Sequence, residues 1–306
     1  MGKVAYVFPG QGSQAVGMGR DLGETSPRWD QANAALGLDL RRLCFEGPEA
    51  ELTLTANTQP AILTASIVAL DALVAAGASF DFVAGHSLGE YSALVAGGAL
   101  DFADAVRTVR ARGQFMQEAV APGEGAMAAI LGLDRALVFR ACEEAGGAGV
   151  VQVANLNAPG QTVIAGATAA VQRAVELAKA KGAKRALPLP VSAPFHCSLM
   201  APAAGRLASV LQTIRIRDLG VPLVTNVDAD LLTEGARVAD TLVRQVTTPV
   251  RWEDVVTRLV KEGAGTFIEV GPGKVLSGLI RRIAPETRVL NVEDRASLEA
   301  TLKALG

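Results

Sequence analysis

The chain has 306 residues, of which 50% are hydrophobic and only 4% aromatic, so Ala, Val and Leu must fill its core. Its 29 basic residues are balanced by 31 acidic ones, and this net charge of −2 argues against a nucleic-acid binder. With 20% charged residues the chain is also too apolar to be disordered. Its length accommodates two domains, or one large domain with an insertion.

Cysteine usage and hydropathy indicate the compartment. Cys44, Cys142 and Cys197 are far apart and odd in number, which predicts neither a disulfide framework nor a zinc site, but a reducing environment. The chain opens as a strand rather than as a signal peptide. Its longest apolar stretch, residues 61–78, contains Asp71 and small polar residues, as is typical of a core helix rather than a membrane span. We therefore expect a soluble, cytoplasmic protein without membrane contacts.

Short β-branched runs alternate with Ala-rich helical segments along the chain, which is the pattern of α/β proteins. The first part is expected to contain a strand at 4–8, a Gly-rich loop at 9–19, a helix at 61–76, a strand at 82–84, and helices at 88–95 and 102–120. Asp101 is the expected N-cap of the last helix.

Residues 124–192 follow a different order. The segment is expected to contain strand 126–131, helix 135–145, strand 150–156, strand 161–165, helix 169–181 and strand 183–188. This β-α-β-β-α-β order is the ferredoxin-like unit, here inserted into a larger domain formed by residues 1–123 and 193–306. The α/β pattern then resumes with helix 199–213, strand 222–226, helices 239–245 and 253–261, and strand 266–270.

The most specific local motif is GHSLG at 85–89, a GxSxG pattern between a strand and a helix. There Ser87 would occupy a tight turn with an exposed hydroxyl, and the glycines would remove side chains that clash. The positive end of the following helix would face a developing oxyanion. The alternative is a chance match in a chain with 32 glycines.

A serine nucleophile needs a base, and the chain has only two histidines. His86 adjoins Ser87, so the two side chains are expected to diverge. His196, in the loop that follows the insertion, is the remaining partner, and no acidic residue stands out as a third member. Cys197 is a rival nucleophile, but its adjacency to His196 favours a buried structural thiol.

Arg112 lies at the edge of the apolar face of helix 102–120, whereas Arg107 and Arg110 point away. A buried arginine needs an anionic partner. That partner is either an internal carboxylate or a substrate carboxylate held by two parallel hydrogen bonds.

Two Gly-rich loops are less specific indicators of function than the GxSxG motif. The loop at 9–15 satisfies the dinucleotide pattern GxGxxA, but residues 26–40 are predicted to be helical, where a Rossmann unit would need a second strand. The loop can still supply a main-chain N–H to an oxyanion hole. The GPGK segment at 271–274 indicates a strand-to-helix turn.

Taken together, six segments resemble the malonyl-CoA:acyl carrier protein transacylases, the acyltransferase family of fatty-acid and polyketide synthesis. They are PGQGSQ (9–14), GHSLGEY (85–91), RGQFM (112–116), NLNAPGQ (155–161), FH (195–196) and GPG (271–273). The resemblance runs in order over nearly the whole chain. It implies a hydrolase-like parallel-sheet domain with a ferredoxin-like insertion.

The resemblance also implies residue roles. Ser87 would be the nucleophile, His196 the base, and Arg112 the holder of the malonyl carboxylate. The oxyanion hole would be formed by the main-chain N–H groups of two residues, Gln11 and Leu88. The carbonyl of Gln245 would orient the histidine in place of an acid, and Phe195 resembles the malonyl-selective version of its position.

The implied reaction is ping-pong transfer of malonyl from malonyl-CoA to the phosphopantetheine thiol of acyl carrier protein, with no metal and no cofactor. A monomer is the default expectation for the oligomeric state. Three alternatives stay open. A serine esterase or thioesterase could use the same Ser-His pair with water as acceptor. A stand-alone loading acyltransferase of polyketide synthesis would share the chemistry and differ in its carrier. A non-enzymatic docking module would not need intact Ser87, His196 and Arg112.

Overall fold

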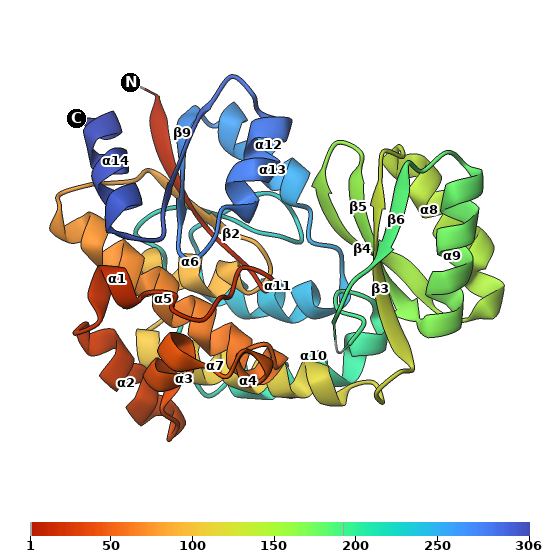
Figure 1. Cartoon of the computed structure of the whole chain (residues 1–306), viewed down its shortest axis with the longest axis horizontal. Coiled ribbons are helices and arrows are strands. Elements are labelled where there is room, and N and C mark those ends of the chain that lie inside the picture. Colours follow the sequence, from red (N-terminus) through yellow and green to blue (C-terminus); the bar gives the residue numbers. More distant parts are fainter. Residues whose placement is uncertain (1, 192) are drawn as a thin grey trace.

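The computed structural model describes residues 2–191 and 193–306 of the chain. Figure 1 shows two parts side by side, a larger one that holds both termini and a smaller one formed by the middle of the sequence. Each part is built on its own sheet, one of six strands and one of four.

The sheet of the larger part is parallel except at one edge. Its strand order is β10-β9-β1-β2-β7-β8, and only the β7–β8 pair is antiparallel. The strands are β1 (Lys3–Phe8), β2 (Phe82–Gly85), β7 (Leu223–Val224), β8 (Leu231–Leu232), β9 (Ala264–Val270) and β10 (Arg288–Val292). The central strands β1 and β2 are almost wholly buried, as expected of parallel strands covered on both faces.

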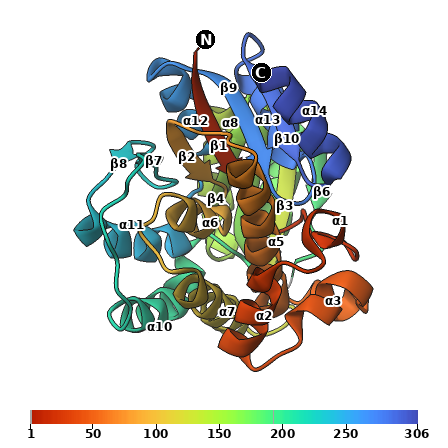
Figure 2. The ribbon, with the colours of Figure 1, turned by 90° about the vertical axis from the view of Figure 1, so that its left-hand side faces the viewer.

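Alternate residues of β1 enter two separate hydrophobic clusters. Tyr6 and Phe8 join the cluster that includes α5 (Thr55–Ala75), α6 (Gly89–Ala96), α7 (Phe102–Glu118), α10 (Ala201–Leu211) and α11 (Gly235–Thr247). Ala5 and Val7 join the cluster under α12 (Trp252–Lys261) and α13 (Val275–Ile283). The two-residue period of the strand thus gives each face its own core. Figure 2 shows this layered arrangement, with α1 (Arg20–Gly23), α2 (Pro27–Leu36), α3 (Leu40–Glu46) and α14 (Arg295–Leu305) at the periphery. The short helix α4 (Glu49–Leu52) follows α3 in the chain.

Helix α5 is the one helix in the described chain that is long and apolar enough to cross a membrane, but 78% of its most apolar window is buried inside the protein. It is therefore the central core helix of the larger part. It begins six residues before the predicted start, with Pro60 inside it. The carbonyl of Ala56, which Pro60 cannot use, accepts a hydrogen bond from Arg110 Nη1 at 3.0 Å. A long-range arginine contact thus satisfies the helix at its proline.

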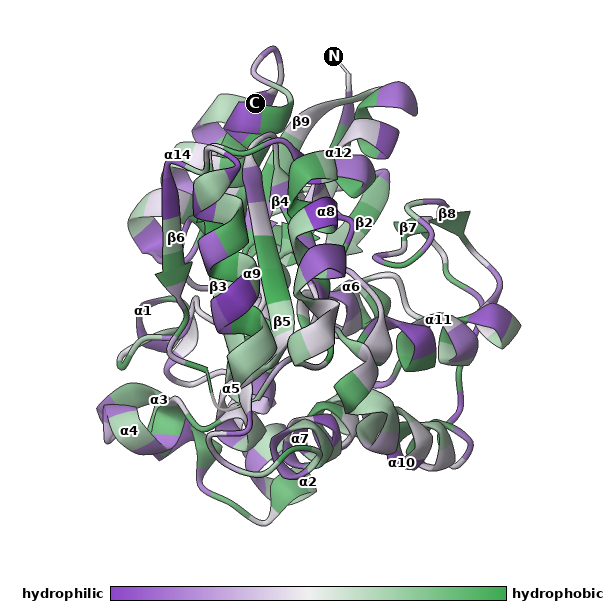
Figure 3. Ribbon diagram, turned by 90° about the vertical axis from the view of Figure 1, so that its right-hand side faces the viewer, coloured by the Kyte–Doolittle hydropathy of each residue, from purple (hydrophilic) through white to green (hydrophobic). Residues whose placement is uncertain are grey.

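The smaller part has the predicted β-α-β-β-α-β order, with every boundary within two residues of the prediction. Its elements are β3 (Gly125–Leu131), α8 (Arg135–Ala145), β4 (Val151–Ala158), β5 (Gln161–Ala167), α9 (Thr168–Ala180) and β6 (Arg185–Pro188). The sheet is antiparallel, in the order β4-β5-β3-β6. Both helices cover one face (Figure 3), while Met127, Ala154, Val163 and Ala165 of the other face join the core cluster of the larger part. Residue 192, the predicted end of the insertion, lies outside the described residues.

Candidate active site

The GxSxG segment forms a sharp turn between β2 and α6. Ser87 has φ of 52°, in the left-handed region that a residue with a side chain rarely adopts. A Cβ on Gly85 would lie 2.0 Å from the main-chain carbon of Gly89, and a Cβ on Gly89 would lie 2.0 Å from Phe8 O. Both glycines are therefore required for α6 to pack this closely against β1 and β2.

Ser87 and His196 are brought together across 109 positions of sequence. Ser87 Oγ and His196 Nε2 are 2.8 Å apart, and His196 Nδ1 lies 2.8 Å from the main-chain oxygen of Gln245. A carbonyl can only accept, so it fixes the proton on Nδ1 and leaves the lone pair of Nε2 directed at the serine hydroxyl. The structure thus brings together Ser87, His196 and the Gln245 carbonyl, whose catalytic roles stay predictions.

The electrostatic environment keeps His196 neutral. Burial, and then the positive charge of Arg112, lower its pKa to about 3, opposed by the hydrogen bond to Gln245. A neutral imidazole can accept the serine proton, so the ring is in the form that a general base needs.

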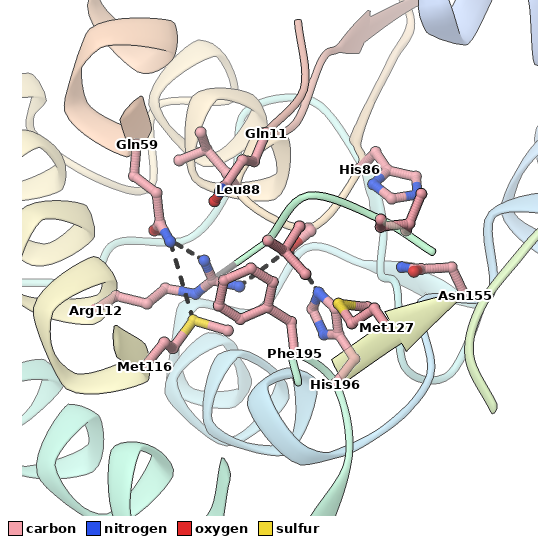
Figure 4. A pocket seen from close by; sticks show the side chains of 13 residues that line it. Gln11, Gln59, His86, Leu88, Arg112, Met116, Met127, Asn155, Phe195 and His196 are labelled. Atoms are coloured by element: carbon pink, nitrogen blue, oxygen red, sulfur yellow. Dashed lines mark hydrogen bonds between the residues drawn. The ribbon is translucent and has the colours of Figure 1, made fainter. Parts of the chain in front are cut away.

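His86 points elsewhere. Its Nε2 lies 2.9 Å from Asn157 Oδ1 in β4, and its ring is 5.7 Å, centroid to centroid, from that of Trp252. Burial lowers the pKa of His86 as well. The side chain thus joins the turn to β4 of the smaller part, and Figure 4 shows its ring apart from that of His196.

Arg112 is 1% exposed and is held by neutral oxygens. Nη1 donates to Gln59 Oε1 at 2.8 Å, and Nη2 donates to Gln245 Oε1 at 3.0 Å and to Ser87 Oγ at 3.1 Å. Its guanidinium carbon lies 5.6 Å from the centroid of the Tyr91 ring. Among the described residues it has no direct carboxylate partner, which disfavours the internal salt bridge and leaves a cation beside the nucleophile.

These groups line a pocket of about 120 Å³ between the two parts. The lining residues are Gln11, Gln59, His86, Ser87, Leu88, Arg112, Met116, Met127, Asn155, Leu189, Val191, Phe195 and His196. Phe195 is 8% exposed and belongs to the apolar part of this wall. Gln11 and Leu88 both line the pocket, and the main-chain N–H groups of these two residues have no acceptor among the described residues.

Three further polar residues of the site were not predicted from the sequence. Asn226 accepts from Ser87 N at 2.7 Å and donates to Gly85 O at 2.7 Å, so it ties the end of β2 and the backbone of the nucleophile to the loop after β7. Gln59 is the second anchor of Arg112. Glu90 directly follows the GxSxG pattern, and an acid in an otherwise apolar helix was a signal available in the sequence.

Glu90 is completely buried. Its Oε2 accepts from Gln245 Nε2 at 2.7 Å and from Asn226 N at 3.2 Å. Burial raises its pKa to about 7, opposed first by the hydrogen bonds from Gln245 and Asn226 and then by the charge of Arg112. The carboxyl thus lies one amide away from the arginine.

Cys197 is not placed to act as a nucleophile. It is fully buried, its thiol donates to Pro194 O at 3.1 Å, and burial raises its pKa to about 11. In the described part of the chain, no group of three His, Cys, Asp or Glu residues could hold a metal ion.

This site and fold are those of an acyltransferase. Residues 5–298 match the acyl transferase domain family. The chain is 51% identical to the malonyl CoA-acyl carrier protein transacylase of Bacillus subtilis, covering 100% of this chain and 98% of that one, and 50% identical to that of Escherichia coli K12, covering 99% and 100%. The chain therefore belongs to the acyl transferase family and, within it, to the malonyl CoA-acyl carrier protein transacylases.

Solved structures agree. The acyl carrier protein S-malonyltransferase of Vibrio cholerae superposes with a TM-score of 0.95 at 47% identity, covering 98% of this chain and 99% of that one. The enzyme of the same name from Burkholderia pseudomallei gives a TM-score of 0.96 at 50% identity, again covering 98% and 99%. A malonyl-transacylase in complex with its type II polyketide-synthase acyl carrier protein gives 0.96 at 46% identity, covering 99% of each.

The packing of the turn gives a first prediction. Gly85→Ala should lower the free energy of unfolding by about 3 kcal/mol, the scale of overpacking a dense core, because the new methyl group would overlap the backbone of α6. Gly278→Ala in α13 is the matched control, since a Cβ there meets no atom within 4 Å and the helix gains up to about 1 kcal/mol. Urea unfolding of both variants measures the difference, and an equal effect of the two would contradict the packing argument.

The burial of His196 gives a second prediction. Its ring signals, followed by NMR in ¹³C-histidine-labelled protein, should not titrate between pH 8 and pH 5, because the folded pKa is about 3. Unfolded chains protonate histidine near pH 6.5, so this group should reduce stability progressively as the pH falls from about 6.5 toward 3. A His196 midpoint near 6.5 would show that the ring is solvated rather than buried.

Proposed function

We propose that this protein transfers the malonyl group of malonyl-CoA to the phosphopantetheine thiol of acyl carrier protein, through a malonyl ester on Ser87, and so supplies fatty-acid elongation. Membership of the transacylase family supports this activity. The observation that carries the residue roles is the chain of contacts from Gln245 O through His196 to Ser87 Oγ, with Arg112 beside it.

In the first half-reaction, His196 Nε2 takes the proton of Ser87 as Oγ attacks the thioester carbonyl. The developing oxyanion would accept hydrogen bonds from the main-chain N–H groups of Gln11 and Leu88. Collapse breaks the carbon–sulfur bond, His196 returns the proton to the departing sulfur, and coenzyme A leaves. The enzyme is left with a malonyl ester and a neutral histidine.

The second half-reaction runs the same steps in the opposite sense. His196 takes the proton of the pantetheine thiol, whose sulfur attacks the ester carbonyl. The carbon–oxygen bond to Ser87 breaks, and His196 returns the proton to Oγ. One base thus serves as base and acid in both halves.

The position of Arg112 supports malonyl as the acyl group that the enzyme transfers. One CH₂ separates the malonyl carboxylate from the carbonyl under attack, so a guanidinium within 3.1 Å of the nucleophile lies within reach of that anion. A planar guanidinium can bind a carboxylate with two charge-assisted hydrogen bonds. The water-excluded position of Arg112 makes such a pair stronger than it would be in solvent. Phe195, on the same wall, is proposed to contribute to this selectivity.

The domain organisation is proposed on the same basis. Residues 1–123 and 193–306 would form a hydrolase-like acyltransferase domain, and residues 124–192 an inserted ferredoxin-like subdomain. The strand order β4-β5-β3-β6, with two helices on one face, supports the second assignment. The protein is expected to act as a cytoplasmic monomer.

An esterase that shares the Ser-His pair is the main alternative. A neutral ester gives no use to a buried guanidinium beside the nucleophile, so Arg112 favours an anionic acyl group. A polyketide carrier is the alternative acceptor, because a structural relative is a malonyl-transacylase in complex with a type II polyketide-synthase carrier protein. Parallel assays with a fatty-acid and a polyketide carrier separate these two acceptors.

The acyl-enzyme is directly testable. Malonyl-CoA should add one malonyl mass to the wild type at the peptide that contains Ser87, and none to Ser87→Ala, as measured by intact and peptide mass spectrometry. Without carrier protein the adduct should persist over many transfer turnovers, since a transferase must exclude hydrolytic water. Carrier protein should then discharge it. An adduct in Ser87→Ala would refute the nucleophile, and hydrolysis as fast as transfer would favour the esterase.

The role of Arg112 is tested by comparing two substrates. Arg112→Ala should cost about 2–5 kcal/mol in kcat/KM for malonyl-CoA, the scale for truncating one partner of a buried charge pair. Acetyl-CoA lacks the carboxylate and should be unaffected or improved. Single-turnover acylation of Ser87 by each thioester gives the ratio. Equal losses on both would make Arg112 a structural residue.

A further inference from the structure

Glu90 is a buried acid that the transfer steps described above do not use. It lies in the first turn of α6, three residues after the nucleophile, and is fully buried. No ion-pair partner of Glu90 lies within the described residues, and its two donors, Gln245 Nε2 and Asn226 N, are both neutral. A buried carboxyl in such surroundings is costly, so its position calls for an explanation.

The contacts of Gln245 define what Glu90 does. The amide nitrogen of Gln245 donates to Glu90 Oε2 and, at 3.0 Å, to Ser87 O, while its amide oxygen accepts from Arg112 Nη2. A rotated amide would direct its oxygen at two acceptors and its NH₂ at a guanidinium. Glu90, together with Ser87 O, therefore selects the one orientation in which Gln245 can hold Arg112, and Glu90 makes the shorter of the two contacts.

We propose that Glu90 is a positioning residue for malonyl selectivity, which acts through the side-chain amide of Gln245 to hold Arg112 at the carboxylate of the acyl group. The inference rests on the proposed role of Arg112. The amide keeps the acid from pairing directly with the arginine. A direct ion pair would have to be broken by each incoming malonyl group, whereas an amide oxygen leaves the charge of the guanidinium available.

The proposal requires that residue 90 present a hydrogen-bond acceptor to Gln245 Nε2 at the distance that a glutamate side chain spans. Glu90→Gln keeps a carbonyl oxygen at the same distance, and should retain selectivity within about threefold. Glu90→Asp keeps the carboxyl but withdraws it by one methylene, and Glu90→Met removes the acceptor. Both should lower the malonyl-to-acetyl ratio by roughly 10- to 100-fold, the range for losing a hydrogen bond in a network that holds a charged group.

The measurement is single-turnover acylation of Ser87 by malonyl-CoA and by acetyl-CoA, quantified by intact mass, with KM and kcat obtained separately. Gln245→Met should reproduce the loss, and Glu90→Met combined with it should add little, because both changes interrupt the same contacts. Glu269→Gln is the matched control. That carboxyl is also fully buried and accepts from two N–H groups, of Leu276 and Ser277, but it caps α13 away from the pocket. It should lower stability without changing the ratio.

The outcomes distinguish failure of the proposed carboxylate site at Arg112 from failure of the proposed role of Glu90. If Arg112→Ala affects both thioesters equally, the proposed carboxylate site is wrong. If Arg112→Ala is selective but Glu90→Asp and Gln245→Met keep the ratio, the carboxylate site stands and the role of Glu90 is refuted. If Glu90→Gln loses as much selectivity as Glu90→Asp or more, charge rather than reach is what matters, and the amide-orientation argument fails. Should Glu90→Met not fold, the Asp and Gln variants with Gln245→Met still decide the question.

Discussion

The hydrogen bond between His196 Nδ1 and the carbonyl of Gln245 is the contact on which the rest of the site depends. Burial keeps this histidine neutral by lowering its pKa. The hydrogen bond then fixes the tautomer of the ring, which makes Nε2 an acceptor for the serine proton. Because the orienting group is main chain, its position is set by the packing of α11 rather than by a side-chain rotamer. The side chain of the same residue reaches Arg112, Ser87 O and Glu90. One helix position therefore sets the geometry of both the base and the cation.

The same arrangement explains how the buried positive charge of Arg112 is held without an ion pair. Arg112 is held by oxygens that are dipolar but uncharged, and the carboxyl of Glu90 lies beyond the Gln245 amide. Hydrogen bonds from a charged donor are stronger than neutral ones, so the side chain is well ordered without an ion pair. Its charge also lowers the pKa of His196, after burial, so the substrate-binding cation and the base are electrostatically linked.

Much of this could be predicted from local sequence. The smaller part was predicted to within two residues because its strands and helices are short, regular and bounded by Gly and Pro. Ser87 was singled out by the GxSxG pattern, His196 because the chain has only two histidines, and Arg112 because it lies at the edge of the apolar face of its helix. The early start of α5 was missed because it depends on Arg110, 54 positions away from the carbonyl it satisfies. The peripheral elements α1, α3, α4, β8, β10 and α14 were missed because they are short or weakly patterned.

The contacts that support the site were harder to foresee. Asn226 and Gln59 carry no motif of their own, and their partners lie 139 and 53 positions away. The role of the Gln245 carbonyl came only from family resemblance, since any residue can present a carbonyl. Such partners become visible only when the sheet order brings β2 next to β7 and packs α7 beside α5.

The burial of the cysteines has a consequence for an enzyme whose products include a free thiol. Each cycle releases coenzyme A beside the pocket, and an accessible thiolate there would be open to mixed-disulfide formation with it once oxidant is present. Cys44, Cys142 and Cys197 are all buried, and burial raises the pKa of Cys142 to about 12 and that of Cys197 to about 11. Thiols in that state are poor nucleophiles. Burial thus keeps the enzyme's own thiols from exchanging with the thiol that each cycle releases.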